Sequence, residues 1–187
     1  MFVHTLGKTA ELRLLEQRHA EELFALTEQS RAHLRRWLPE SDVPGSLGDC
    51  RTVIKAGLEQ FANNLGILAG IWCDGRLAGV IGLGKIEWEN RSSNIGYWLG
   101  ESFQGKGLAV EACRALINYA FQDLKLKRLE VRCATDNPKS CAIPRRLGFR
   151  KEGVLLQSQA LDDRYLDIEV YGLLAEEWGT GQVKPST

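Results

Sequence analysis

The chain of 187 residues predicts an α+β fold, in which a central mixed, mostly antiparallel sheet of about seven strands is flanked by about four helices. Three β-rich runs and the hairpin dipeptide Asp74-Gly75 indicate an antiparallel meander in mid-chain. A strand–turn–helix–strand order over residues 94–134 predicts one parallel pair with a right-handed crossover. No linker or repeat interrupts the pattern, so we expect one domain over residues 1–178 and a flexible tail over 179–187.

Three elements precede the meander. Near-alternation of apolar residues predicts a first strand over 11–15, and apolar residues at helical spacing predict a helix over 17–38. Ser46 is a candidate N-cap, with Asp49 as its capping-box partner, for a second helix that extends to about residue 64. The inner face of this second helix is expected to hold four apolar residues: Val53, Ile54, Leu58 and Phe61.

Strands and helices then alternate to the C-terminus. Strands are expected over six ranges: 67–73, 77–85, 94–99, 129–134, 150–159 and 165–173. Asp162-Asp163 marks the turn between the last two strands. One helix is expected over 108–124. A shorter helix follows Asn137, a candidate N-cap, with Pro138 at its first position and Gly148 just past its end.

Charge and cysteine content exclude several classes of protein. Lys plus Arg and Asp plus Glu both number 24, so the formal net charge is zero, which argues against general nucleic-acid binding. No apolar run approaches the ~20 residues of a membrane span, and the N-terminus lacks the pattern of a secretory signal. We therefore expect a cytoplasmic location and no membrane partner. The five scattered cysteines form no CxxC pair, so no metal site or disulfide framework is expected.

A glycine-rich turn joins the expected strand 94–99 to the helix that follows, with the sequence Gln104-Gly105-Lys106-Gly107-Leu108-Ala109. Glycine allows close backbone approach and unusual torsions. The N-terminus of a helix adds unpaired N–H donors and a favourable dipole. With Lys106 as an additional cation, the turn is suited to the pyrophosphate of a nucleotide cofactor.

Two other phosphate-binding motifs do not match the sequence. The P-loop pattern GxxxxGK[ST] does not occur. A Rossmann fingerprint needs a third glycine where Val110 stands, and it follows an early strand rather than a meander. A turn that merely connects two elements remains the alternative interpretation of the glycines.

The same six residues match the Q/R-x-x-G-x-G/A signature of the GNAT superfamily of acetyl-CoA-dependent N-acetyltransferases. Neighbouring segments resemble the RimJ/RimL-type enzymes, which acetylate the N-termini of ribosomal proteins. These segments are Trp37-Leu38-Pro39, Ile95-Gly96-Tyr97-Trp98-Leu99, Glu101-Ser102-Phe103, Asn137-Pro138-Lys139-Ser140, Leu147-Gly148-Phe149 and Glu152-Gly153. The similarity extends from about Glu11 to Trp178. It implies a three-layer α/β GNAT fold in which the two parallel strands splay apart.

The resemblance implies that acetyl-CoA is the cofactor, released as CoA, and that its pantetheine arm lies between the splayed strands. The residues that match cofactor contacts are Tyr97, Trp98, Leu99, Gln104, Gly105, Lys106, Gly107, Leu108, Ala109, Asn137 and Ser140. Asn137 is also the candidate N-cap, and the two roles are compatible if its backbone and side chain divide the work.

Ser140 and Glu87 are the candidate catalytic residues. Ser140 matches a position near the CoA sulfur, where a hydroxyl can protonate the leaving thiolate; the alternative is a solvent-facing serine in a first helical turn. Relatives can carry a glutamate as general base where Gln159 stands, and an amide cannot take the proton. Glu87 is the expected substitute, acting directly or through a water. An exposed carboxylate with no role is the alternative for Glu87.

The expected acceptor is a primary amine, and amine pKa values indicate which kind. Near pH 7.4, an α-amine with a reference pKa of about 7.7–8.0 is roughly a fifth to a third neutral, whereas a lysine amine at about 10.4 is only about 0.1% neutral. A site without a strong base therefore favours the N-terminal α-amine of a ribosomal or other protein. Trp37, Trp88 and Tyr165 are candidate walls of the acceptor pocket, with core packing as the alternative.

Two other functions remain open from the sequence. A small-molecule acetyltransferase that acts on a polyamine, an amino sugar or an aminoacyl toxin needs the same cofactor half. A non-catalytic acyl-CoA-binding module is the other, and Gln159 supports it. The cleft between residues 34–44 and 157–165 is expected to be broad and open for a peptide, but closed and acidic for a polyamine. The resemblance also allows a homodimer.

Overall fold

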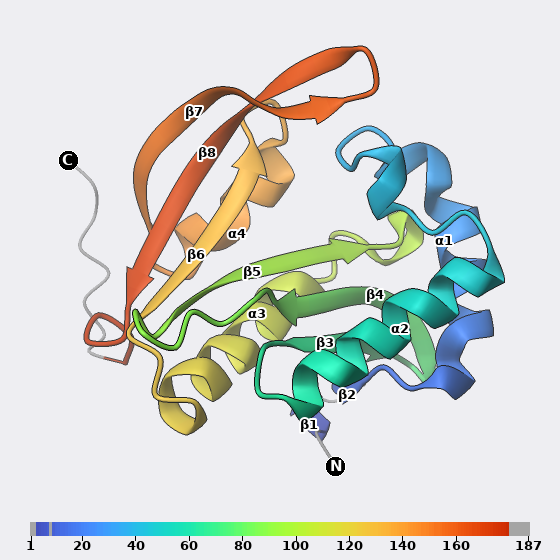
Figure 1. The fold of residues 1–187 in the computed structure, drawn as a ribbon, viewed down its shortest axis with the longest axis horizontal. Coiled ribbons are helices and arrows are strands. Elements are labelled where there is room, and N and C mark those ends of the chain that lie inside the picture. The colour runs from blue at the N-terminus through green and yellow to red at the C-terminus, as the bar shows by residue number, and fades with distance from the viewer. Residues whose placement is uncertain (1–2, 8, 180–187) are drawn as a thin grey trace.

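The computed structural model describes residues 3–7 and 9–179, and these residues form one mixed sheet of eight strands (Figure 1). In chain order the strands are β1 (Val3–Leu6), β2 (Ala10–Leu14), β3 (Ile67–Cys73), β4 (Arg76–Leu83), β5 (Ser92–Leu99), β6 (Arg128–Ala134), β7 (Arg150–Leu161) and β8 (Arg164–Leu174). Their spatial order is β1-β2-β3-β4-β5-β6-β8-β7, with β5 and β6 parallel and the other neighbours antiparallel. The predicted α+β class is confirmed, whereas residues 180–187 of the expected tail lie outside the described part.

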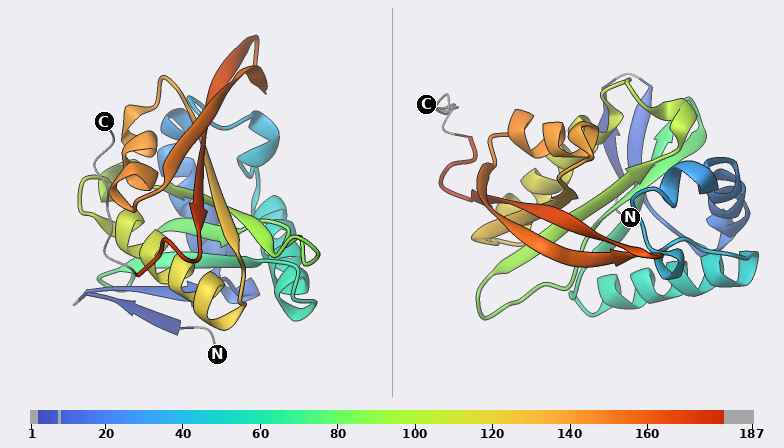
Figure 2. Two further views of the ribbon diagram at one scale, coloured as in Figure 1. Left: turned by 90° about the vertical axis from the view of Figure 1, so that its left-hand side faces the viewer. Right: turned by 90° about the horizontal axis from the view of Figure 1, so that it is seen from above.

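Helices cover both faces of the sheet. In the described part of the chain they are α1 (Ala20–Leu34), α2 (Leu47–Ala62), α3 (Leu108–Asn118) and α4 (Pro138–Arg146). α1 and α2 pack on each other over β3 and β4, and α3 and α4 lie on the opposite face (Figure 2). None of these helices is long and apolar enough to cross a bilayer.

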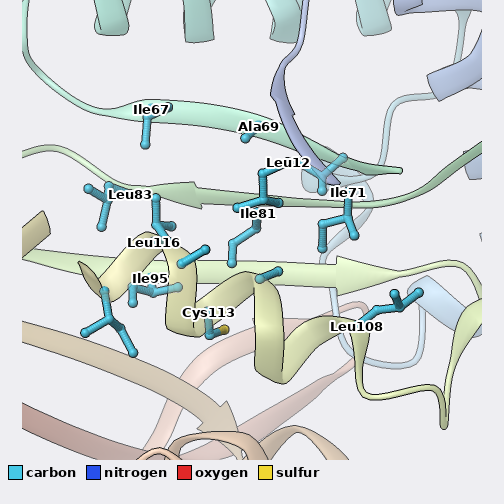
Figure 3. Close-up of a cluster of buried hydrophobic side chains, with 14 of the residues drawn as sticks. Leu12, Ile67, Ala69, Ile71, Ile81, Leu83, Ile95, Leu108, Cys113 and Leu116 are labelled. Atoms are coloured by element: carbon cyan, nitrogen blue, oxygen red, sulfur yellow. The ribbon is translucent and has the colours of Figure 1, made fainter. Parts of the chain in front are cut away.

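The main hydrophobic core lies between α3 and the sheet (Figure 3). Alternate residues of the central strands point toward α3 and are buried there: Ile67, Ala69, Ile71, Ile81, Leu83 and Ile95. Because successive strand residues face opposite sides, the intervening residues point toward α1 and α2. Leu68 packs this way against Gly57, where an added Cβ would lie 2.7 Å from the Leu68 Cβ, so the glycine lets α2 approach the sheet closely.

The parallel strands part after four paired residues. Ser92–Ile95 of β5 pairs with Arg128–Val131 of β6. Beyond these pairs, β5 stays bonded to β4 as far as Leu99, and β6 stays bonded to β8 as far as Ala134. Each strand therefore keeps its outer neighbour while the inner edges separate, which confirms the expected splay.

Several turn and cap predictions are confirmed. The hairpin dipeptide Asp74-Gly75 has φ of 51° and 74°, as a tight hairpin turn requires. Gly148 follows α4 with a φ of 84°. The Ser46 side chain accepts a bond from the Asp49 amide at 3.1 Å and caps α2. The Asp49 carboxylate, however, accepts from the Gly45 amide rather than completing a capping box with Ser46.

Some predicted elements differ from the observed ones. The helix predicted over 17–38 is a 3-10 turn followed by α1, which ends at Leu34, before Pro39. Val53 was predicted on the inner face of α2 but is 41% exposed, because the buried stripe consists of Cys50, Ile54 and Gly57. The helix predicted over 108–124 is α-helical only to Asn118 and continues as a π-helical turn to Asp123.

The strand β1 was not predicted. Three of its four residues are exposed, so the segment lacks the alternating pattern of a half-buried strand. It forms because its backbone pairs with β2, from Val3 opposite Arg13 to Leu6 opposite Ala10. This strand raises the sheet from the expected seven strands to eight among the described residues.

Candidate active site

The predicted phosphate-binding turn lies between β5 and α3. After Leu99 the chain forms a 3-10 turn, Glu101–Phe103, and reaches α3 through Gly105 and Gly107, whose φ angles are 75° and 77°. Residues with a side chain rarely adopt such angles. A Cβ built on either glycine meets no other atom within 4 Å. Both glycines therefore border open space on the outside of the turn.

Backbone donors at this corner have no acceptor. Among the described residues, the amides of Gly107, Leu108, Ala109 and Val110 make no hydrogen bond, and the first bond of α3 runs from the Glu111 amide to the Gly107 carbonyl at 3.1 Å. Unpaired N–H groups at a helix N-terminus, together with the helix dipole, form an anion-binding site. This arrangement supports the anion-binding interpretation of the turn over a simple connection.

Side chains from three elements hold the turn in place. The Lys106 ammonium lies 5.3 Å from the ring centroid of buried Phe103. The Gln104 amide nitrogen lies 2.6 Å from Nε2 of His33, near the end of α1, and its Oε1 accepts a 3.5 Å bond from Nζ of Lys139 in α4. Two lysines thus flank the turn, and Gln104 connects it to both α1 and α4.

His33 can accept this bond because its ring is neutral. Burial lowers the pKa of His33 below its usual 6.5, with Arg36 and Lys139 acting in the same direction and Glu101 opposing them. The amide nitrogen of Gln104 can only donate, so the facing ring nitrogen has to carry a free lone pair. The two residues are 71 positions apart, and no local pattern in the sequence connects them.

The N-terminus of α4 brings Asn137 and Ser140 to the open side of β6. The Asn137 Oδ1 accepts from the Ser140 amide at 3.1 Å, which confirms Asn137 as the N-cap. The Ser140 carbonyl accepts from the Tyr97 hydroxyl, also at 3.1 Å. Within the described residues, the Ser140 hydroxyl and the Asn137 side-chain nitrogen make no hydrogen bond, so both remain available to a ligand in the splay.

Tyr97 crosses from β5 to α4 where the strands have parted. Burial raises the pKa of Tyr97 well above its usual 10, and the nearby Cys113 thiol adds to the effect. The phenol therefore stays protonated and serves as a donor. Trp98 and Leu99 follow on the same strand and pack against the main core. All three predicted pantetheine residues thus lie on β5 beyond Ile95, the last β5 residue that pairs with β6.

This corner fits a cofactor of the CoA type. The unpaired amides and left-handed glycines suit a diphosphate, and the flanking Lys106 and Lys139 add positive charge. The separated edges of β5 and β6 offer backbone groups to an extended amide arm, and Asn137 and Ser140 stand at their mouth. When bound, such a cofactor supplies an activated acyl thioester.

The loop between α1 and α2 contacts the tip of the β7–β8 hairpin near the open end of the splay (Figure 1). The Arg35 guanidinium pairs with Asp162 at 2.9 Å, and the Gln159 side chain donates to the Trp37 carbonyl at 3.1 Å. The Trp37 ring packs on a small apolar cluster formed by Ala134, Leu161, Leu166 and Ile168. Gln159 therefore helps to join the loop to the hairpin, and Trp37 lies beside the last residue of β6.

The other predicted acceptor-side residues are not gathered at one place. Glu87 bridges to Ser92 at the start of β5, five residues and roughly 16 Å of extended chain from Tyr97, and pairs with Lys85 at 3.6 Å. Trp88 follows Glu87 and donates to the Asn64 carbonyl just past α2. Tyr165 is 66% exposed on the hairpin. Trp37 and Tyr165 share the neighbourhood of the hairpin, whereas Glu87 and Trp88 lie together in the loop before β5.

A polar cluster centred on the buried Glu169, behind α4, was missed by the sequence interpretation. Glu169 of β8 accepts hydrogen bonds from Lys151 at 2.6 Å, from Arg145 at 2.9 Å and from the Tyr171 hydroxyl. Burial alone would raise the pKa of Glu169, but these bonds hold it at about 2. The cluster ties α4, which carries Ser140, to β7 and β8. Single charged residues on separate elements gave no signal in the sequence.

A splayed parallel pair beside an anion-binding helix N-terminus defines the class of acyl-CoA-dependent transferases, and comparison with known proteins gives the family. The model of the Acetyltransferase (GNAT) domain matches residues 10–150. The protein YdaF of Bacillus subtilis (strain 168) is 38% identical over 179 residues, which cover 95% of this chain and 98% of YdaF. The ribosomal-protein-serine acetyltransferase of Escherichia coli (strain K12) is 30% identical over 171 residues, or 91% and 96% of the two chains.

Among solved structures, RimL, a ribosomal L7/L12 alpha-N-protein acetyltransferase in complex with coenzyme A, superposes with a TM-score of 0.89. It is 28% identical and covers 94% of this chain and 99% of its own. The chain belongs to the GNAT family of acetyltransferases. It is an N-acetyltransferase of the group that includes the RimJ/RimL-type enzymes, and acetyl-CoA is its cofactor.

Proposed function

We propose that this enzyme acetylates the N-terminal α-amine of a protein, and that a ribosomal protein is its acceptor. One relative that matches over nearly its whole length is named a ribosomal-protein-serine acetyltransferase, and the RimL structure is named a ribosomal L7/L12 alpha-N-protein acetyltransferase. The observation that carries the proposal is that, among the described residues, neither expected position of a general base places one beside the splay. Gln159 stands where relatives can have a glutamate and is bonded to the Trp37 carbonyl. Glu87 lies near the other end of β5.

Because the pKa of an N-terminal amine is low, the enzyme can acetylate it without a general base. A sizeable fraction of an α-amine is neutral at physiological pH, whereas a lysine amine is almost wholly protonated. An enzyme that only has to select the neutral amine needs no residue with a raised pKa for proton removal. The position of Glu87 favours a role in acceptor binding over proton transfer.

The proposed division of work follows from the geometry. The amides of residues 107–110 hold the diphosphate, with Lys106 and Lys139 beside them, and Asn137 holds the arm. Positioning of the thioester against the amine supplies much of the rate. The free hydroxyl of Ser140 lies at the mouth of the splay, where it can donate a proton to the departing sulfur.

A peptide assay tests the acceptor class. Purified enzyme with acetyl-CoA is expected to release free CoA with peptides that carry a free N-terminus. It should be inactive on the same peptides with a blocked N-terminus and an internal lysine. Mass spectrometry locates the acetyl group. Turnover on lysine side chains or polyamines alone would reject the proposed acceptor while leaving the family assignment intact.

One observation favours a small-amine acceptor as the second candidate. The contact of the α1–α2 loop with the β7–β8 hairpin narrows the cleft that was expected to be broad for a peptide. The acidic side chains of this contact are paired, because Arg35 bridges to Asp162 and Glu40 and Arg164 bridges to Asp136. A polyamine prefers an acidic pocket, so the α-amine of a peptide remains the better-supported acceptor.

A further inference from the structure

A polar groove lies over the paired part of β5 and β6. Its volume is about 350 Å³. The lining residues are Lys85, Glu87, Ser92, Ser93, Asn94, Arg128, Glu130 and Arg132. None of them belongs to the cofactor corner, so the groove is a separate feature of the molecule, here called the β5–β6 groove.

The charged side chains of this groove come from the face opposite α3. Val131 pairs in register with Ile95, which points toward α3 and is buried. Because side chains alternate along a strand, Arg128, Glu130 and Arg132 project from the other face. This is the face on which α1, α2 and the loop–hairpin contact lie. The groove is thus on the side from which an acceptor can approach the splay without crossing α3 or α4.

Arg132 holds the most important position in the groove. It directly follows Val131, the last β6 residue paired with β5, and so lies where the two strands begin to part. The acyl group is expected deeper in the same splay, beside Ser140. A peptide whose N-terminal amine reaches the splay from this face therefore passes Arg132 within its first few residues.

The charged side chains in the groove differ in how many of their hydrogen-bonding atoms are paired. The Arg128 guanidinium is shared between Glu152 at 2.5 Å and Glu130 at 3.2 Å. Both carboxylate oxygens of Glu130 are occupied, one by Arg128 and the other by Nε of Arg132 at 2.7 Å. The two terminal nitrogens of Arg132 contact no acceptor among the described residues, and its side chain is 60% exposed. Glu130 therefore holds the Nε of the Arg132 guanidinium, while its two terminal nitrogens stay unpaired among the described residues.

A fixed and unfilled guanidinium fork matches a carboxylate. Such a fork binds carboxylates through two parallel hydrogen bonds. Lys85, which is 74% exposed, lies in the same groove and pairs with Glu87 at 3.6 Å. We propose that the β5–β6 groove binds the acceptor peptide behind its N-terminal amine, and that Arg132 selects an acidic side chain near that N-terminus. The inference rests on the proposed function.

An aspartate scan measures this selection. Peptides of identical length begin with serine and carry Asp, Asn or Lys at one position from the second to the sixth. The wild-type enzyme is expected to prefer Asp over Asn at one or two of these positions by about fivefold to tenfold in kcat/KM. It should disfavour Lys there, and the preference should shrink as salt is raised. Arg132→Gln should abolish the preference, so that kcat/KM becomes equal for the Asp and Asn peptides. Arg132→Glu should reverse the preference, so that the Lys peptide is acetylated better than the Asp peptide.

Controls separate the possible failures. Arg114→Gln removes an arginine from α3 on the other face and should keep the full preference for Asp. Activity on the all-Asn peptide shows that each variant is folded. No preference in the wild type, or an undiminished preference in Arg132→Gln and Arg132→Glu, would overturn the inference while the α-amine acceptor stands. If no peptide of any charge is acetylated although acetyl-CoA binds, the proposed function fails and the inference fails with it.

Discussion

Single residues at the cofactor corner each have one definable task. Gly105 and Gly107 provide backbone angles and open space, Gln104 joins the turn to its neighbours, and Ser140 presents a free hydroxyl. These tasks are separable because they rest on different atoms. Substitution of one residue should therefore change one measurable step of binding or catalysis.

The glycine at the start of α3 allows the sharpest residue-level test. Gly107→Val forces a β-branched side chain to a φ of 77°, which strains the backbone that carries the unpaired amides. We expect the Kd for CoA, measured by calorimetry, to rise at least about tenfold, with Gly105→Val behaving similarly. Gly75→Val is the matched control, since its φ is 74° and its Cβ also meets open space, but in the β3–β4 hairpin. It should lose comparable stability and bind CoA normally; equal Kd values for the two variants would contradict the assignment.

Ser140 and Glu87 are distinguished by which kinetic constant changes. Ser140→Ala should lower kcat by roughly a hundredfold without weakening acetyl-CoA binding, because it removes only a proton donor. Glu87→Gln should raise the KM for the acceptor and leave kcat within about twofold, given its place in the β5–β6 groove. Steady-state kinetics with the best peptide acceptor provide both constants. A collapse of kcat in Glu87→Gln would restore Glu87 as the general base.

The His33–Gln104 pair predicts a pH dependence of cofactor binding. The pKa of His33 is lowered from its usual 6.5, so the ring is mostly neutral at pH 7 and becomes cationic as the pH falls below 6.5. A cationic ring can no longer accept the Gln104 bond. We therefore expect CoA affinity to fall about threefold to tenfold between pH 7.5 and about 5, which is the worth of one such bond. Calorimetry of His33→Gln, which cannot titrate, supplies the baseline; an identical pH profile for the two proteins would be evidence against the pair.

Secondary-structure elements carry the site because each is fixed at a distance from it. α4 presents Asn137 and Ser140 at one end, and its other end is tied to β8 through Arg145 and Glu169. α3 presents its unpaired amides while its apolar side packs on the sheet (Figure 3). A polar cluster outside the reaction site can thus set the position of a reacting group.

Glu169 predicts how stability responds to acid. Its pKa of about 2 in the folded protein lies below the usual 4.5, so the folded state favours the charged form. Its contribution is present above about pH 4.5 and is lost as the pH falls toward 2, and it amounts to something of the order of 2 kcal/mol. Urea unfolding of wild type and Glu169→Gln should show a difference at pH 7 that shrinks between pH 4.5 and 2.5. A difference that does not vary with pH would mean that Glu169 acts through packing alone.

The whole molecule shows which features a sequence can predict and which arise only from the fold. The turn at residues 104–109, the N-cap at Asn137 and the hairpin at Asp74-Gly75 were predictable because the chemistry of each is confined to a few consecutive residues. β1 was not, because it depends on a pairing partner rather than on its own pattern. The bond between Gln159 and the Trp37 carbonyl joins residues 122 positions apart, and it gives Gln159 a structural role that no local pattern shows.

The acceptor side was less predictable than the cofactor side for the same reason. The proposed diphosphate contacts are backbone groups of one turn, whereas the β5–β6 groove combines side chains from two strands and the loop before β5. The alternating charges at residues 128, 130 and 132 are unremarkable in the sequence. They acquire meaning only once the parallel pairing places Arg132 at the parting of the strands.

A crystal structure of the enzyme with acetyl-CoA would examine the anion-binding corner most directly. The diphosphate oxygens are expected within hydrogen-bonding distance of the amides of residues 107–110, with the acetyl end between β5 and β6 and within reach of the Ser140 hydroxyl. A diphosphate bound elsewhere, with those amides still facing solvent, would contradict the assignment of this corner and the reaction geometry built on it.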